Sequence, residues 1–309
     1  MSGFLAYVLR RLLAAFITLL GVIAVLVFTF QVLPGNPARV IAGPLASAEQ
    51  VEKIHKSMGL DRPVVVQYWR YLEQVARGNL GTSARTGNSV WSEIASRLPY
   101  TLALAILGTL LGVIFGIPLG ILAATNKDRW PDMLGSMIGV MGISMPVYWT
   151  GILLIVFFGV MLKLLPVSGA DTLASYVLPS VTLGVFSMAI VSRMTRSTML
   201  ETLDQDYIRT VRGKGVREIV AVRHALHNAF IPILTVISLQ FGTVLGGAVL
   251  TETIFSWPGI GRLLITSIQA RDFPMVEGIV LVFAAMFILV NLVTDLLYTV
   301  IDPRVKLYQ

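Results

Sequence analysis

The sequence predicts an all-α integral membrane protein with about six transmembrane helices. Of its 309 residues, 55% are hydrophobic and 13% are charged, which is about half the charged fraction of a typical soluble domain. The apolar residues also gather in long runs without Asp, Glu, Lys or Arg, and a spanning helix needs about 20 such residues. Five long runs and a shorter sixth, which continues past Asp295 to residue 301, meet this description: residues 12–38, 98–126, 133–162, 172–192, 224–251 and 278–294.

The first run argues against a cleaved signal peptide. It follows Arg10 and Arg11 and extends over residues 12–38, whereas the apolar core of a signal peptide has about 7–15 residues. We therefore expect a retained membrane helix. The net charge is +7, but the cations are not gathered on one large aqueous domain, which disfavours nucleic-acid binding. The absence of cysteine excludes disulfides and thiolate metal sites.

Basic residues predict the orientation of the chain, because Lys and Arg are enriched in short cytoplasmic loops. With both termini in the cytoplasm, the short outer loops hold only Lys163, Arg262 and Arg271. The long first loop is weakly constrained by this rule. The inner segments hold Arg10, Arg11, Lys127, Arg129, Arg193, Arg196, Arg209, Arg212, Lys214, Arg217, Arg223, Arg304 and Lys306.

Residues 34–98 are predicted to form a helical extracytoplasmic insertion after the first span. Ser47 and Gln50 have the spacing of a capping box, and Gly59 stands where a helix C-cap belongs. A second helix is expected after Pro63 and a third after Ser89. The insertion is either an amphipathic layer on the bilayer or a docking surface for an external partner.

Small residues predict where helices approach closely. Glycines recur every four residues in the second run and again in the fifth, a spacing that lets two backbones come together. Pro118, Pro146 and Pro179 lie inside apolar runs, where each removes a backbone donor and can kink its helix. The predicted packing residues are Gly108, Gly112, Gly116, Gly120, Gly242 and Gly246.

The segment 209–232 is basic and helix-patterned, and it lies between two apolar runs. Gly215 interrupts it, and Val216, Ile219 and Val220 then form a short apolar stripe. We expect a helix, a turn and a short amphipathic helix at the cytoplasmic face. From the residues alone, an interfacial helix held to anionic lipid is the first interpretation, and a helix inserted into a groove of a partner is the second.

Motifs along nearly the whole chain follow one known pattern. They are Leu33-Pro34-Gly35-Asn36-Pro37, Leu60-Asp61-Arg62-Pro63, Ser192-Arg193-Met194-Thr195-Arg196, Asp206-Tyr207-Ile208-Arg209-Thr210, Lys214-Gly215, His224-Ala225-Leu226, Asn228-Ala229, Ile231-Pro232, the segment from Phe255 to Arg262, and Asp302-Pro303-Arg304. With these motifs the chain resembles the permeases of ABC importers, in particular the dipeptide and oligopeptide branch. Residues 129–132 and 168–171 resemble the glutathione-type members.

The general coupling signature of ABC importers is poorly kept. When its Gly is placed on Gly215, Arg209-Thr210-Val211 stand at its Glu-Ala-Ala and Asn228 stands at its Pro. The resemblance nevertheless implies a cytoplasmic coupling loop over residues 193–231 within a single permease domain, residues 1–309. The implied ATPase-coupling residues are Arg209, Thr210, Lys214, Gly215, Val216, Arg217, Ile219, Val220 and His224.

The resemblance implies a permease subunit of an ATP-driven importer for dipeptides or short peptides in the bacterial inner membrane. The implied partners are a second homologous permease, two ABC ATPase subunits, an extracytoplasmic solute-binding protein and the lipid bilayer. ATP and Mg²⁺ are expected on the ATPase subunits, and the chain itself is expected to be no enzyme and to hold no cofactor. It has no Gly-x-x-x-x-Gly-Lys-Ser/Thr motif for ATP phosphates.

A candidate gate lies at the outer end of the fifth run. Glu252 is a carboxylate at membrane depth, where charged side chains usually face a protein interior or water. It either binds the amino terminus of a peptide or caps the gate through hydrogen bonds. The candidate pathway and gate residues are Glu252, Phe255, Trp257 and Pro258, whereas Asp295 is expected to be structural.

Other functions are weighed by the chemistry they need. An ion-coupled secondary transporter usually carries ionisable residues at mid-membrane, and the spans are nearly bare of them. An intramembrane enzyme needs an acid, base or metal set at one depth; His224 and His227 are three residues apart, but no metal site is predicted. The substrate is left open among dipeptides, longer peptides, glutathione and nickel chelates.

The orientation predicts which loops react with external reagents. A single cysteine at Ser83 should be labelled from outside and one at Lys127 only after membrane disruption, because residues 34–98 are expected outside. Maleimide labelling of intact cells measures this. The reverse pattern of labelling would invert the assignment.

Overall fold

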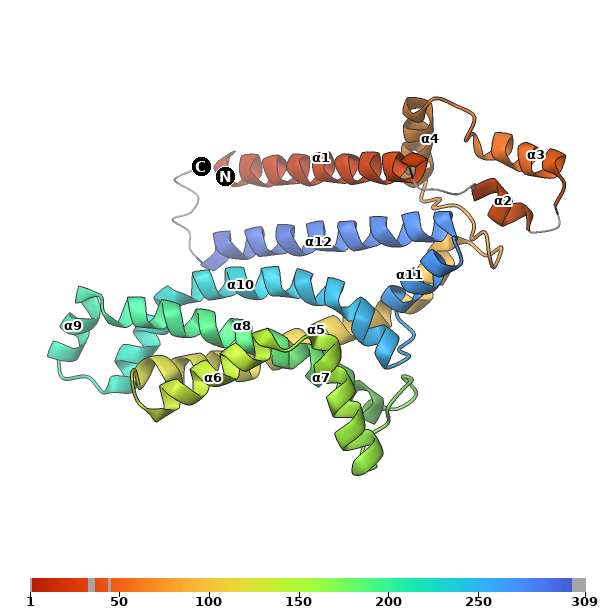
Figure 1. Cartoon of the computed structure of the whole chain (residues 1–309). Coiled ribbons are helices and arrows are strands. Elements are labelled where there is room, and N and C mark those ends of the chain that lie inside the picture. The colour runs from red at the N-terminus through yellow and green to blue at the C-terminus, as the bar shows by residue number, and fades with distance from the viewer. Residues whose placement is uncertain (1, 33–36, 44–45, 302–309) are drawn as a thin grey trace. The chain divides into compact units, whose positions relative to one another are not determined.

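The computed structural model describes residues 2–32, 37–43 and 46–301, which are helical apart from short connections (Figure 1). Within these residues, pairing of the β type is confined to an isolated bridge between Thr82 and Ser89. The helices are α1 Ser2–Val32, α2 Pro37–Ala42, α3 Ala48–Met58, α4 Val64–Ala76, α5 Val90–Thr125, α6 Trp130–Ser144, α7 Val147–Leu154, η1 Ile155–Met161, η2 Leu173–Tyr176, α8 Val177–Leu203, α9 Asp206–Gly213, α10 Glu218–Ile254, α11 Ile260–Gln269 and α12 Phe273–Ile301.

The chain forms two compact units. Unit 1 comprises Met1–Pro99 and Gly259–Leu292, and unit 2 comprises Tyr100–Pro258 and Val293–Gln309. One boundary lies between α10 and α11, and the other two fall inside α5 and α12, so each of these two helices contributes to both units. The predicted coupling and gate residues all belong to unit 2.

By length and composition, the described residues hold five helices that could cross a membrane, or six if the bent pair α6–α7 counts as one span. The pair α6–α7 is bent by 101° at residues 145–146. Pro146 precedes α7, and Met145 before it is extended, as a residue before proline prefers to be. Pro118 lies within the unbroken α5, and Pro179 lies in the first turn of α8, where the missing N–H costs no helical bond.

In unit 1, the predicted capping of α3 is confirmed. The Ser47 hydroxyl accepts from the Gln50 amide at 3.2 Å, and the Gln50 side chain accepts from the Ser47 amide at 2.9 Å. Gly59 ends α3 in the left-handed conformation with φ of 72°. The third helix expected after Ser89 is not separate: it is the beginning of α5, because its apolar residues continue without a break into the second run. The start of the predicted insertion, residues 34–36, lies outside the described residues.

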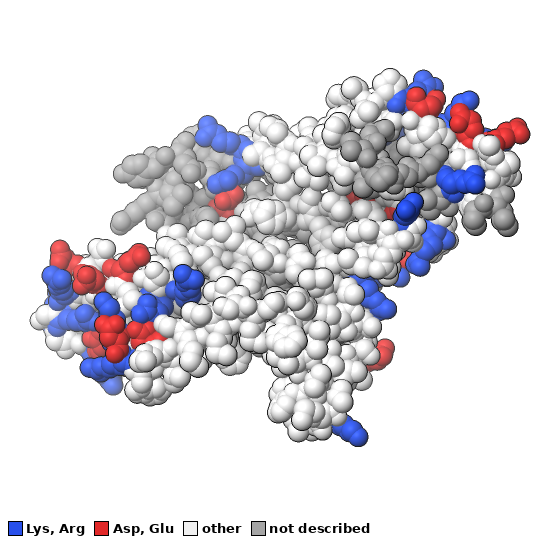
Figure 2. Space-filling view, viewed as in Figure 1, with Lys and Arg blue, Asp and Glu red and all other residues white. Residues whose placement is uncertain are grey.

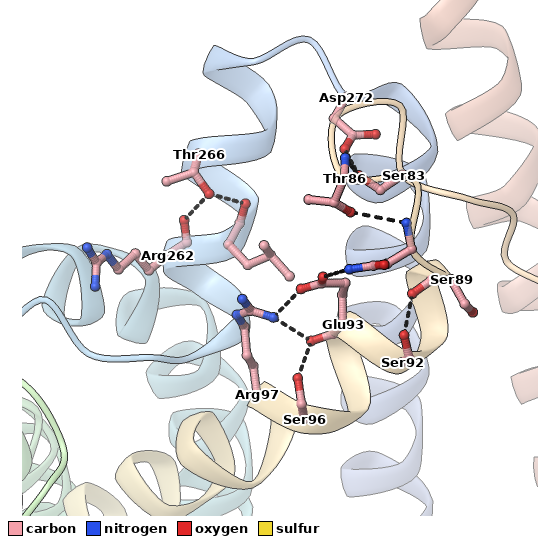
Figure 3. A network of polar contacts seen from close by, with 12 residues as sticks. Ser83, Thr86, Ser89, Ser92, Glu93, Ser96, Arg97, Arg262, Thr266 and Asp272 are labelled. Atoms are coloured by element: carbon pink, nitrogen blue, oxygen red, sulfur yellow. Dashed lines mark hydrogen bonds and ion pairs between the residues drawn. The ribbon is translucent and has the colours of Figure 1, made fainter. Parts of the chain in front are cut away.

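Unit 1 is held together by an apolar core and by a buried carboxylate. The core joins α1, α5, α11 and α12 through Ile23, Leu26, Val27, Leu80, Val90, Ile94, Ile260, Leu263, Met275, Ile279 and Leu281. Asp272 is 2% exposed. It accepts hydrogen bonds from the Ser83 hydroxyl and from the Ala84 amide, the latter at 2.9 Å (Figure 3). This carboxylate therefore fixes the loop that leads into α5.

The same loop corrects the choice of a labelling position. Ser83 is 4% exposed because its side chain points at Asp272. A cysteine there would be shielded from reagents on either side. Thr86 lies in the same loop and is exposed, so it is the better outer reporter for the topology experiment.

In unit 2, the glycine ladder of α5 packs against α8 of the same chain. A Cβ placed on Gly108 would lie 2.7 Å from the Leu183 Cβ, and one on Gly120 would lie 2.6 Å from the Ser192 carbonyl oxygen. A Cβ on Gly112 would meet Ser187, and one on Gly116 would lie 2.9 Å from the Met188 carbonyl oxygen. The predicted close packing is present at all four positions, and it lies within the chain.

The predicted packing at the fifth span is different. Gly246 is exposed, and a Cβ there would meet nothing within 4 Å; Gly242 on the same helix is partly buried. Within the described residues, no neighbouring helix lies within 4 Å of a Cβ on Gly246, so close packing at this position stays a prediction.

A second small-residue face, on α6, was not predicted. Gly135, Gly139 and Gly142 are buried, and a Cβ on Gly142 would lie 2.6 Å from the Ala189 Cβ on α8. Their spacing of four and three residues is the helical signal that could have identified this face. Small residues therefore let α8 receive both α5 and α6 at close range.

Replacing Gly112 with Leu should destabilise the chain, because the added side chain would collide with Ser187 on α8. Overpacking a tight interface costs about 1–3 kcal/mol. Thermal unfolding of the purified chain in detergent measures the loss. Gly246→Leu is the matched control, since its Cβ meets open space. Equal unfolding temperatures for the two variants would contradict the packing assigned to Gly112.

Candidate functional site

The short helix α9 connects α8 to α10 at one end of unit 2 (Figure 1). Its Ile208 is fully buried and belongs to an apolar core with Met199 of α8 and Ala221, Ala225, Ala229 and Ile233 of α10. Tyr207, Arg209 and Thr210 on the remaining faces are exposed. The helix is thus anchored on one side, and it presents polar and aromatic side chains on the other.

The turn after α9 is shaped by a glycine and an ion pair. Gly215 has φ of 73°, a backbone angle that side-chain-bearing residues rarely adopt. Across the turn, the Arg212 guanidinium donates to the Glu218 carboxylate at 3.1 Å and 2.5 Å. These hydrogen bonds raise the pKa of Arg212 above its ordinary value. The pair fastens α9 to the first turn of α10.

The coupling residues predicted from sequence are all exposed, but their helical arrangement differs from the prediction. The short amphipathic helix expected after Gly215 is instead the first part of α10, which begins at Glu218 and runs without a break to Ile254. The separate short helix is α9, before the glycine. Val216, Ile219 and Val220 are 38%, 72% and 36% exposed, because Ala221 and its successors supply the buried face.

Charged side chains concentrate at this end of unit 2. Figure 2 shows Lys, Arg, Asp and Glu gathered around α9 and the start of α10, whereas the spans beyond are nearly free of charge. Arg209 lies 3.7 Å from Asp204 and 3.6 Å from Asp206. Exposed ion pairs of this kind contribute little to stability. Their side chains can therefore exchange partners and contact another protein at little cost to the fold.

At the other end of unit 2, three of the four predicted gate residues are buried, and Pro258 is partly buried. Glu252 is 0% exposed and accepts a hydrogen bond from the Thr101 hydroxyl at 2.6 Å. Trp257 is also 0% exposed, and its indole N–H donates to the Tyr100 carbonyl at 3.2 Å. Its ring meets the Tyr176 ring edge to face at 4.5 Å. Of the two roles left open for Glu252, this geometry favours the hydrogen-bonded cap.

Phe255 and Pro258 complete this end of the unit. Phe255 is 1% exposed, its ring lies beside Gly151 of α7, and its carbonyl accepts from the Gly169 amide at 3.0 Å. Pro258 follows Trp257 directly and is the last residue of the first segment of unit 2. The aromatic cluster therefore ties the end of α10 to α7.

A buried ion pair escaped the sequence analysis. Asp132 in the first turn of α6 receives the Arg196 guanidinium of α8 on both carboxylate oxygens, at 2.5 Å and 2.8 Å. Each residue stood in a motif that was noted for other reasons, and nothing in the sequence pairs positions 64 residues apart.

The described residues offer no cation site. Within residues 2–32, 37–43 and 46–301, no group of three or more His, Asp or Glu side chains is placed to hold a metal ion. His224 and His227 are both exposed on α10.

Long apolar helices, a bent helix pair and a charged end built on a short helix are the features of a polytopic membrane protein. The chain belongs to the family of binding-protein-dependent transport system inner membrane components, which matches residues 116–307. Residues 4–105 match the N-terminal part of the same membrane components. The chain is accordingly a permease subunit of an ABC importer, the class of transporter that works with an ATPase and a binding protein.

Relatives match over almost their full length. The glutathione transport system permease protein GsiC of Salmonella paratyphi A is 47% identical over 304 residues, covering 98% of this chain and 99% of the relative. The protein of the same name from Escherichia coli strain K12 is 46% identical over the same coverage.

Solved structures share the fold at low identity. The MetNI methionine ABC transporter in an inward-facing conformation has a TM-score of 0.60 at 16% identity, covering 68% of this chain and 96% of that one. An amino acid ABC transporter solved with histidines has a TM-score of 0.51 at 18% identity, covering 69% and 94%.

The hydrogen bond to Glu252 predicts the effect of Thr101→Val. The substitution keeps the shape of the side chain and removes the hydroxyl that reaches the buried carboxylate. Losing one partner of a buried group costs about 1–3 kcal/mol. Thermal unfolding in detergent should show this loss, and Thr243→Val is the control because Thr243 is exposed on α10. A Thr101→Val chain as stable as the control would remove the cap assigned to Glu252.

Proposed function

We propose that this chain is one half of the translocation pathway of an ATP-driven importer for glutathione and related short peptides. The observation that carries the substrate class is the 47% identity, over 98% of the chain, to permeases named for glutathione transport. These relatives favour glutathione over the nickel-chelate alternative. An ion-coupled mechanism is disfavoured by the family of the chain.

The proposed assembly contains a second homologous permease, two ATPase subunits that bind ATP and Mg²⁺, and a solute-binding protein on the outer face. Both termini lie in the cytoplasm and the region 34–98 lies outside, as the Lys and Arg distribution favours. Under this arrangement α9 and the start of α10 face the ATPase subunits. The aromatic cluster of Phe255 and Trp257 then lies toward the outer face.

Coupling is proposed to act through α9 together with the first turn of α10. Closure of the ATPase subunits must move the spans, which requires an element that is exposed to the ATPase and also anchored in the permease. α9 meets both conditions, because Ile208 is buried and Tyr207 and Arg209 are exposed. Ile219, at 72% exposure, supplies an apolar contact beside it, in the manner of a helix received by a groove.

The test is uptake of labelled glutathione by the complete transporter reconstituted in proteoliposomes with its binding protein. Import should require ATP and the binding protein, and unlabelled glutathione should compete better than an unrelated dipeptide. Ile219→Asp should reduce uptake about tenfold, since a buried apolar contact in an interface is replaced by a charge. It should also weaken co-purification of the ATPase subunits.

Leu173→Asp is the matched control for this experiment. Leu173 is 88% exposed and precedes α8, at the opposite end of that helix from α9. The charge added there should leave ATPase binding unchanged. Equal ATPase retention and uptake in the Ile219→Asp and control transporters would contradict docking at this end. Preferential uptake of nickel chelates would contradict the substrate class.

A further inference from the structure

The ion pair between Asp132 and Arg196 is built more firmly than a surface contact. The Asp132 side chain is 6% exposed and that of Arg196 is 30% exposed. The two nitrogen–oxygen contacts, at 2.5 Å and 2.8 Å, give the two-pronged geometry that fixes orientation as well as distance. Asp132 additionally accepts from the Asp128 amide at 3.0 Å.

The pair also holds a turn in an unusual conformation. Asp128 has φ of 61°, in the left-handed region that residues with a side chain seldom occupy and that persists only where the surroundings determine it. The carboxylate of Asp132 supplies the acceptor for that amide. One side chain thus fixes the α5–α6 turn and joins it to α8.

Stability alone does not account for such a pair. Buried ion pairs contribute little net stability compared with apolar side chains of similar size, whereas a two-pronged pair fixes the orientation of the elements it joins. The positions of the two residues indicate what this orientation serves. Arg196 lies on α8 one turn before Met199, and Met199 packs in the core that holds Ile208 of α9.

α8 therefore carries two attachments close together near its end, one to α9 and one to α6. α6 leads to the 101° break and then to α7, where Gly151 lies against Phe255 and Thr182. A continuous path of contacts runs from α9 through α8 and α6 to the aromatic cluster.

We propose that Asp132 and Arg196 are a positioning pair that makes the third span follow α8 and α9 when the ATPase subunits close. The proposal rests on the coupling role given to α9 above. Without the pair, α9 still engages the ATPase, but its displacement is no longer passed in full to α6. ATP hydrolysis then continues while transport per ATP falls.

The first experiment measures uptake and ATP hydrolysis together in the reconstituted transporter. Asp132→Asn should lower the amount of substrate imported per ATP about tenfold, within the range that coupling between distant sites usually spans. Arg196→Lys keeps the charge and loses the two-pronged geometry, so it should give a smaller loss. Ser136→Ala is the control, because Ser136 only reaches Asp132 at 3.5 Å. The proposal would be overturned if both pair variants imported as much substrate per ATP as the unsubstituted transporter, or if Ser136→Ala lowered this amount equally.

The second experiment reads the mechanical link without an uptake assay. The chain has no cysteine, so spin labels can be placed at Met137→Cys on α6 and Gln205→Cys before α9, both exposed positions. Pulsed EPR on the assembled transporter should show one distance, with and without nucleotide, when the pair is intact. With Arg196→Lys or Asp132→Asn, nucleotide should produce a second or broader distance.

Identical distance distributions in the intact and substituted transporters would sink the positioning role, whatever the uptake assay shows. The outcomes also separate this proposal from the proposed function. If the unsubstituted transporter imports no peptide with ATP, the proposed function fails on its own. If it imports peptide, and only the Asp132 and Arg196 variants import less substrate per ATP, both proposals stand.

Discussion

The close approach of α5 and α8 is the constraint on which unit 2 depends. Four glycines on α5 bring its backbone within reach of α8, where a single added carbon would collide with Leu183, Ser187, Met188 or Ser192. Lipid tails are as apolar as the side chains, so helices in a membrane associate chiefly through such contact. Because α8 is held on this side by α5 and on another by α6, its end supports α9 in a defined place.

The two ends of unit 2 are built from different interactions. The end at α9 is exposed and rich in charge, and a small apolar core under Ile208 anchors it. The opposite end is closed by Trp257, Phe255 and the carboxylate of Glu252, all buried. The exposed, charged end is suited to contact a soluble partner, and the buried end is suited to hold its shape.

Sequence patterns predicted the spans, the capping of α3 and the glycine contacts of α5, because each depends on residues close together in the chain. They did not predict that the segment after Gly215 would be the start of α10. The helical spacing of Ile219 and Val220 is the same in a short helix as in the first turns of a long one. α11 was missed because its ten residues fall short of a span.

Contacts between distant residues were beyond these patterns. The pairing of Asp132 with Arg196, and of Thr101 with Glu252, arises from the packing of helices that are far apart in sequence. Burial of Glu252 likewise follows from its neighbours and not from its own helix. Gly246 shows the opposite case, since its spacing matched a packing motif and no helix among the described residues meets a Cβ placed there.

The break between α6 and α7 has a consequence for the solvent around the third span. A helix end leaves backbone carbonyls and amides without partners in the helix, and hydrocarbon offers them none. Here one helix ends at Ser144 and the next begins at Val147, in the middle of an otherwise apolar run. Lipid tails cannot solvate this point of the chain. The third span therefore needs protein or water beside it at the depth of Met145 and Pro146, and its surroundings there are wetter or more crowded than its composition alone suggests.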